Sequence, residues 1–170
     1  MRGHVETLRR LKYRPTGGFA AFALADPAPG ATAALLDHER VPKPAWAAFV
    51  AACAPVIAVI DELPTTLRAG RGHHLELHVV NDLRHPVEDL TASVTMTWEG
   101  RAGEPVLRRA WTGAVAADSV ERIGVLDLTV PAPPSVDGTG PATLLVALEL
   151  TRGGERIGCR LVRRAVTPRP

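Results

Sequence analysis

The stretch GGFAAFALADPAPGATAALLDHERVPKPAWAAF, residues 17–49, decides the fold that we expect for the first part of the chain. An apolar run, Phe19–Leu24, follows two glycines and ends at Asp26-Pro27, which is typical of a strand that passes into a loop. A loop with prolines and a glycine comes next, and Pro44 suits the first position of a helix. The stretch therefore predicts a strand, a loop and a helix, in that order.

Apolar residues recur at helical spacing on both sides of this strand, over His4–Arg14 and over Pro44–Cys53. In the first of these helices we expect the charged residues to face solvent: Glu6, Arg9, Arg10 and Lys12. A parallel strand that is apolar on both faces needs neighbours on both of its edges. Because this sequence offers Phe19–Leu24 no such neighbour, we expect it to pair with the C-terminal strands, to pair with another chain, or to remain poorly ordered.

From Val56 onward the apolar residues recur at every second position, which is the period of a strand with one buried face. The pattern is clearest over Leu90–Glu99, where Leu90, Val94 and Met96 alternate with polar residues. Turn signals separate the strands, and the whole region predicts a β-sandwich of the immunoglobulin-like type. The expected strands are Val56–Ile60, Leu75–Val80, Leu90–Glu99, Val106–Thr112, Arg122–Val130, Leu144–Leu150 and Ile157–Leu161.

The quoted stretch resembles the end of the catalytic (β/α)8 barrel in family 2 glycoside hydrolases, the β-mannosidase-like branch especially. The matching segments are Gly18-Phe19, Leu24–Gly30, Leu36-Asp37-His38 and Arg40–Trp46. The family motif has an asparagine and two tryptophans where this sequence has Ala25, Ala28 and Ala33. In these enzymes a β-sandwich follows the barrel. The resemblance thus implies a mainly β chain, with a helix-strand-helix remnant of the barrel over residues 1–55 and an immunoglobulin-like sandwich over residues 56–170.

The resembled enzymes are hydrolases of carbohydrate metabolism that cleave O-glycosyl bonds with two catalytic glutamates on earlier barrel strands. Both glutamates would precede residue 1, so the resemblance implies a C-terminal fragment with a truncated barrel that supports the enzyme and is inactive alone. It also implies that carbohydrate binds only in an intact barrel, which an upstream barrel chain or self-association would complete. The alternative left open is a stand-alone β-sandwich that binds or scaffolds other molecules.

Barrel enzymes build their sites at the C-terminal ends of the strands. The loop after Phe19–Leu24 therefore supplies the candidate substrate-loop residues, Asp26, Asp37 and His38. Asp26 matches the family motif and could help to shape a sugar site, but an aspartate before proline also orders a turn. Asp37 and His38, with Glu39 beside them, could bind a ligand or transfer a proton, or could simply be a solvated loop. The missing tryptophans remove the surface on which a sugar would stack.

Two further groups of residues allow a binding interpretation. His74, Glu76 and His78 alternate along one expected strand and share a face, so they are a weak candidate for a divalent metal site. Any solvent-facing strand shows the same pattern, and we expect no cofactor. An arginine group could bind an anionic partner or could cover solvated sheet faces. Its members are Arg108, Arg109, Arg156, Arg160, Arg163 and Arg164.

The composition excludes several classes of protein. With 170 residues, 46% hydrophobic and 22% charged, the chain has room for one globular domain, or for one domain plus a fragment. A net charge of +2 and 4% aromatic residues argue against nucleic acid as a partner. No apolar run has the length of a membrane span, and the first residues do not have the pattern of a signal peptide. Cys53 and Cys159 lie on different expected elements, which favours buried free thiols and a cytoplasmic location.

Overall fold

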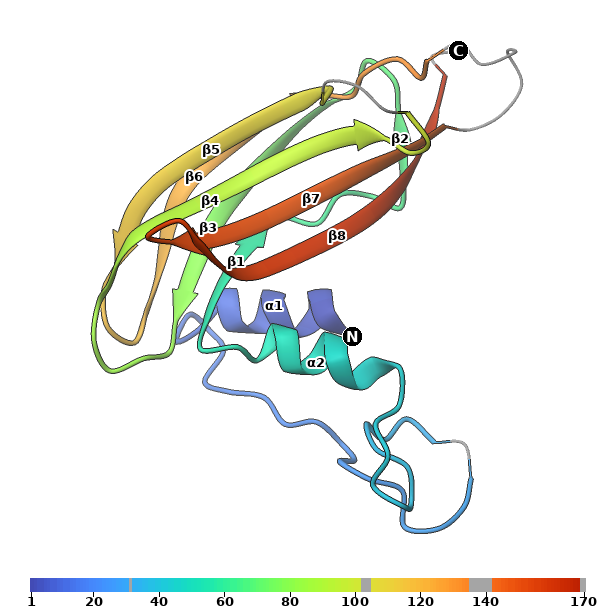
Figure 1. Ribbon diagram of the computed structural model, residues 1–170, viewed down its shortest axis with the longest axis vertical. Helices are drawn as coiled ribbons and strands as arrows, with labels where there is room; N and C mark the ends of the chain where they lie inside the picture. Colours follow the sequence, from blue (N-terminus) through green and yellow to red (C-terminus); the bar gives the residue numbers. More distant parts are fainter. Residues whose placement is uncertain (31, 102–104, 135–141, 169–170) are drawn as a thin grey trace. The chain divides into compact units, whose positions relative to one another are not determined.

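The computed structural model describes residues 1–30, 32–101, 105–134 and 142–168 of the chain (Figure 1). The chain divides into two compact units, Met1–Pro55 and Val56–Pro170. The protein is mainly β, with 50% of the described residues in strands or isolated bridges and 11% in helices, which confirms the expected fold class. None of the helices in the described ranges is long and apolar enough to cross a membrane.

The N-terminal unit contains two helices, α1 (Arg2–Arg10) and α2 (Ala45–Ala52). Both lie where the periodicity predicts them, but α1 ends at Arg10 rather than at Arg14. The backbone of Tyr13 adopts a positive φ of 63°, and its N–H donates to the Thr16 carbonyl at 2.6 Å. The chain therefore leaves the helical path before the proline that we expected to end it.

Two charged residues of α1 are buried, contrary to the expectation that they face solvent. Glu6 accepts a hydrogen bond from Arg2, whose Nε lies 2.7 Å from its Oε1. Arg9 donates to the carbonyl of Ala52 and, at 2.8 Å, to that of Ala54. The last carbonyls of a helix have no partner within it, so Arg9 caps the C-terminal end of α2. Helical periodicity could not show this, because the partners lie far away in the sequence.

The predicted strand Phe19–Leu24 does not form. Its pairing is limited to its C-terminal end, where the Leu36 N–H donates to the Leu24 carbonyl at 2.9 Å, and where Ala25 and Leu36 form an isolated parallel bridge. The side chain of Phe22 is 96% exposed. A parallel strand is stable when ladders on both edges satisfy its backbone. The described part of this unit supplies only this short contact, so the segment stays irregular.

Residues 56–170 form a β-sandwich, whose strands run from green to red in Figure 1. One sheet has three strands in the order β1-β3-β6, and the other has five in the order β2-β8-β7-β4-β5. The short β2 runs parallel to β8, and the other neighbouring strands are antiparallel. The strands are β1 (Val56–Ile60), β2 (Thr66–Arg68), β3 (Gly72–Asn81), β4 (Val87–Trp98), β5 (Leu107–Val115), β6 (Ser119–Thr129), β7 (Ala142–Arg152) and β8 (Glu155–Thr167).

The strands expected from the period-two pattern are all present, several of them longer than expected. In β4, buried residues such as Leu90, Val94 and Met96 alternate with half-exposed ones, as the sequence predicts. These side chains meet those of the other sheet in one core, which residues 56–170 supply by themselves. The sequence did not predict β2, because three residues are too few to show a period.

The alternation in β8 is opposite to the one that its apolar residues suggest. Cys159 and Leu161 are exposed, and Leu161 is 57% exposed. Arg160 and Arg164 occupy the inward positions, because their cross-strand partners in β7 are the core residues Leu148 and Leu144. The expectation of buried cysteines is therefore wrong: Cys159 faces outward and Cys53, which ends α2, is also exposed, although neither forms a disulfide.

Candidate functional site

The candidate substrate loop is organised by the buried carboxylate of Asp26. Its Oδ2 lies 2.5 Å from Lys43 Nζ, and the Thr32 hydroxyl donates to its Oδ1. Lys43 also donates to the Thr32 carbonyl at 3.2 Å. The hydrogen bond from the Lys43 ammonium, followed by that from Thr32, lowers the pKa of Asp26 below its ordinary value. Asp26 is thus an ionised residue that fixes both the loop and the start of the chain segment leading to α2.

Lys43 and Thr32 belong to this cluster, although the sequence predicted no functional role for either of them. Lys43 lies within the stretch that resembles the glycosidase motif, and this was the only signal that could have drawn attention to it. The Lys43 N–H also donates to the Leu35 carbonyl at 3.0 Å, so both its backbone and its side chain hold the loop. These contacts occupy both carboxylate oxygens of Asp26, and they support the turn-ordering interpretation of this residue. A contact between Asp26 and a sugar stays a prediction.

Asp37 and His38 lie on a separate turn of the same loop. Asp37 Oδ1 accepts the N–H groups of Glu39 at 2.9 Å and of Val41 at 2.8 Å. An aspartate that bonds to the following backbone in this way stabilises a turn. The His38 ring is partly exposed, and its Nε2 is 3.9 Å from Glu39 Oε1. The arrangement is that of an ordered, solvated turn, and a role in binding substrate stays a prediction for both residues.

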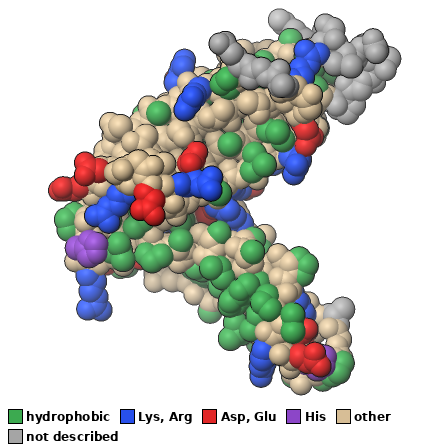
Figure 2. All heavy atoms as spheres, viewed as in Figure 1, with side chains coloured by type: hydrophobic (Ala, Val, Ile, Leu, Met, Phe, Trp, Pro, Cys, Tyr) green, Lys and Arg blue, Asp and Glu red, His purple; other side chains and the backbone are tan. Residues whose placement is uncertain are grey.

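An apolar groove of about 540 Å³ lies beside this loop in the N-terminal unit. Phe19 and Phe49 meet edge to face in its wall, with ring centroids 6.5 Å apart. On the face drawn in Figure 2, hydrophobic side chains gather over this unit. The groove is suited to an apolar surface rather than to a polar substrate, since its walls come from α1, α2 and the small or apolar residues of the chain between them. Its lining residues are Met1, His4, Val5, Leu8, Phe19, Ala20, Ala21, Phe22, Ala23, Ala33, Leu35 and Phe49.

The weak metal candidate lies on the outer face of β3, as the alternation predicts. His74 Nδ1 is 2.7 Å from Asp127 Oδ1, whereas Glu76 is bound to Arg122 at 2.7 Å. This arginine is the main cause of the lowered pKa of Glu76. His78 Nε2 is 3.6 Å from the other oxygen of Glu76. Among the described residues, no group of three or more histidine, cysteine or acidic side chains gathers closely enough to hold a metal ion.

No family model matches this sequence, and no curated protein matches it. Several solved structures, in contrast, match the fold of this chain. The β-D-mannosidase from Dictyoglomus thermophilum matches with a TM-score of 0.64 and 15% identity, over 96% of this chain and 18% of that one. The exo-chitosanase CsxA from Amycolatopsis orientalis matches with a TM-score of 0.68 and 21% identity, over 95% of this chain and 18% of the enzyme. At these identities the likeness shows the fold alone.

The chain is therefore similar in structure to the C-terminal domain of family 2 glycoside hydrolases. It spans less than a fifth of the length of the two enzymes, 18% in each case. This similarity confirms the family resemblance at the level of the fold.

Proposed function

We propose that this chain is the C-terminal, non-catalytic part of a β-mannosidase-like family 2 glycoside hydrolase. The observation that carries the proposal is the likeness to a β-mannosidase and to an exo-chitosanase over 95–96% of the chain. The sandwich unit, residues 56–170, makes up 115 of the 170 residues, or about two thirds. A match of this extent therefore includes the helix-bearing N-terminal unit. If the likeness came only from a common type of β-sandwich, the match would cover residues 56–170 alone.

The apolar groove supports the same proposal on physical grounds. Exposed apolar surface of this kind usually marks a contact with another apolar surface. Phe22 lies open in the groove wall, and Phe19–Leu24 has the composition of a buried parallel strand without the ladders of one. In the proposal, the preceding strands and helices of a barrel fill the groove and give this segment its missing partners.

The buried carboxylates of the N-terminal unit support a non-catalytic role. Hydrolysis with retention uses two carboxyl groups about 5 Å apart, one as nucleophile and one as acid and base. Among the described residues of this unit, Glu6 and Asp26 are the buried carboxylates, and each is held by a cation, Arg2 or Lys43. In the proposal, Asp26 keeps the loop at the barrel rim in shape and the sandwich supports the barrel.

The test compares the chain alone with the same chain joined to the polypeptide encoded directly upstream of its Met1 codon. We expect hydrolysis of p-nitrophenyl β-mannoside or β-glucosaminide by the joined protein only. Phe22→Asp should lower that activity by placing a charge in the apolar contact, whereas Leu161→Asp, which changes an exposed leucine of the sandwich, should not. Equal activity without the upstream part, or an upstream region that encodes no barrel, would refute the proposal.

A stand-alone binding or scaffolding module is the second candidate. It is favoured by the sandwich core, which residues 56–170 complete without help from the N-terminal unit. Gel filtration with a hydrophobic dye separates the two candidates for the chain by itself. A compact monomer that binds no dye supports the module. Self-association or dye binding that Phe22→Asp reduces supports a groove that needs a partner.

A further inference from the structure

The strand β5 ends the five-stranded sheet, and within the described ranges no strand pairs with its outer edge (Figure 1). Six of its nine residues are exposed. In an antiparallel sheet, every second residue of an edge strand points its N–H and C=O groups away from the neighbouring strand. Such unpaired groups can accept a further strand. The outer edge of β5 is therefore a template for strand addition.

The other edges of the two sheets are less suited to a further strand. β2, at the opposite end of the same sheet, has only three residues, and the three central residues of β1 are buried. In β6 the register shifts, because Leu77 and His78 of β3 lie opposite Gly124 and Arg122 and leave Ile123 as an extra residue. An irregularity of this kind twists an edge strand and discourages pairing.

The pairing of β5 with β4 is regular from Leu107 to Gly113, and two arginines lie within this range. Arg109 lies opposite the core residue Val94, whereas Arg108 lies opposite Thr95. Successive side chains of a strand point to opposite faces of the sheet. Both arginines are nevertheless exposed. A strand added at this edge would thus meet one guanidinium group on each of its two faces.

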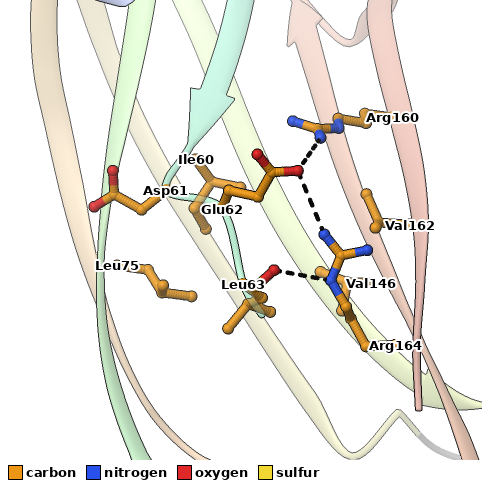
Figure 3. A pocket seen from close by; sticks show the side chains of 9 residues that line it. All are labelled: Ile60, Asp61, Glu62, Leu63, Leu75, Val146, Arg160, Val162 and Arg164. Atoms are coloured by element: carbon orange, nitrogen blue, oxygen red, sulfur yellow. Dashed lines mark hydrogen bonds and ion pairs between the residues drawn. The ribbon is translucent and has the colours of Figure 1, made fainter. Parts of the chain in front are cut away.

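The charges of these two arginines are available to a partner. The arginines of β8 that face inward, Arg160 and Arg164, lie 3.7 Å and 3.6 Å from Glu62 Oε1 (Figure 3). Arg109, in contrast, donates to the Arg108 carbonyl at 3.0 Å. In the part of the chain that the structure describes, no carboxylate forms an ion pair with Arg108 or Arg109. The regular edge therefore carries two positive charges that suit an acidic ligand.

We propose that the outer edge of β5 binds an extended acidic segment of a partner protein, which adds to the sheet as a further strand. Main-chain hydrogen bonds hold the segment, and two successive Asp or Glu residues meet Arg108 and Arg109 on its two faces. Charge decides between the possible occupants, since a second copy of β5 would bring the same positive charges to the interface. The inference concerns the sandwich alone and does not rest on the proposed function.

The test uses the full chain and a fluorescein-labelled peptide, Thr-Val-Glu-Glu-Val-Thr-Val, in fluorescence anisotropy at low salt. One reference peptide has Lys-Lys in place of Glu-Glu. A second keeps the acidic sequence but carries N-methyl groups on its peptide nitrogens, so it cannot complete the hydrogen bonds of a strand. We expect saturable binding of the unmethylated acidic peptide only, together with slower hydrogen exchange of the β5 amides.

Two double variants with the same change of net charge assign the site. Arg108→Glu with Arg109→Glu should weaken binding of the acidic peptide by about tenfold and should allow the lysine peptide to bind. Arg68→Glu with Arg71→Glu is the matched control, because these exposed arginines lie at and after β2, the other end of the same sheet. This control should bind the acidic peptide as the wild type does.

Several results would overturn the proposal. Equal binding of the acidic and the N-methylated peptide would show a contact of charges without strand addition, and equal weakening in the two double variants would show an effect of net charge. Protection of the β5 amides that rises with protein concentration in the absence of peptide would show that a second copy covers the edge. The absence of saturable binding at millimolar peptide would also refute it. If a double variant does not fold, the three peptides on the wild-type chain still decide.

Discussion

Replacing Gly124 with alanine tests how closely the two sheets approach each other at one end of the sandwich. Gly124 lies on β6, opposite Leu77 of β3, and the indole ring of Trp111 on β5 covers it. A Cβ atom at this position would lie 2.3 Å from both Cδ1 and Nε1 of the ring. Carbon atoms in good contact are about 3.5–4.0 Å apart. The added Cβ would thus lie more than 1 Å closer to the ring than a good contact allows, so either the ring or the strand must move by at least this amount.

The magnitude follows from the size of this clash. Trp111 packs against the hydrophobic core, so a displaced ring loses contacts that solvent does not replace. Overpacking of this kind costs about 1–3 kcal/mol of the free energy of unfolding. In a domain of this size 1 kcal/mol corresponds to roughly 3–5 °C. We therefore expect Gly124→Ala to lower the Tm by about 3–15 °C, measured by circular dichroism and confirmed by guanidinium unfolding at an unchanged m-value.

Gly113→Ala is the matched control, since it lies on β5, the strand that precedes β6 in the chain. There an added Cβ would lie 3.8 Å from Ile123 Cγ2, which is an ordinary contact. We expect a neutral effect or a stabilisation of up to about 1 kcal/mol. Trp111→Leu should remove most of the cost of Gly124→Ala in a double-mutant cycle. Equal Tm values for the two alanine variants, or a cycle with no coupling, would refute the close approach of ring and strand.

Three more perturbations test other contacts of the structure. Arg9→Met removes the cap from the end of α2 and should lower the free energy of unfolding by about 1–3 kcal/mol, with faster amide exchange in α2. Arg14→Met changes an exposed arginine and should have little effect. Equal amide exchange in the two variants would contradict the cap. Asp26 has a lowered pKa, so its ion pair stabilises the fold above the ordinary pKa of 3.8 and loses this effect as the pH falls through the lower folded-state value. The stability difference between the wild type and Asp26→Asn should therefore shrink in acid unfolding experiments below about pH 4, and a constant difference down to pH 2 would argue against the ion pair. The amide of Asn81 is buried and bonds to backbone groups of Leu83, His85 and Ala116. Asn81→Ala should cost about 2–4 kcal/mol in urea unfolding, and a loss below 0.5 kcal/mol would show that water replaces these bonds.

The strands of the sandwich were predictable because their signal is local. Leu90, Val94 and Met96 recur with the period of a strand, and the same residues line the core between the sheets. The signal fails where it is short or ambiguous. β2 has three residues, and β8 carries apolar and basic residues on alternate positions, so either face could have been the buried one. The pairing of β8 with β7, together with a shift of register near Leu150, determines which face of β8 is buried.

In the candidate site, too, local features were predictable from the sequence and contacts between distant residues were not. The sequence identified Asp26 in its loop, because an aspartate before proline after an apolar run is a local pattern. It could not identify Lys43 or Thr32 as partners of that carboxylate, since an ion pair depends on where the chain returns.

By itself, then, the sequence determined the two helices, the main strands, the loop that carries Asp26 and the resemblance to the end of a glycosidase barrel. These all depend on neighbouring residues or on short periods along the chain. Only the tertiary structure decided that Arg9 is buried as a helix cap, that Phe19–Leu24 lacks a ladder, and that Arg160 and Arg164 turn inward to share Glu62. Each of these outcomes depends on a partner that is distant in the sequence, or on the lack of such a partner. Ion pairs, hydrogen bonds and burial depend on how close groups lie in space, and the order of residues along the chain does not give these distances.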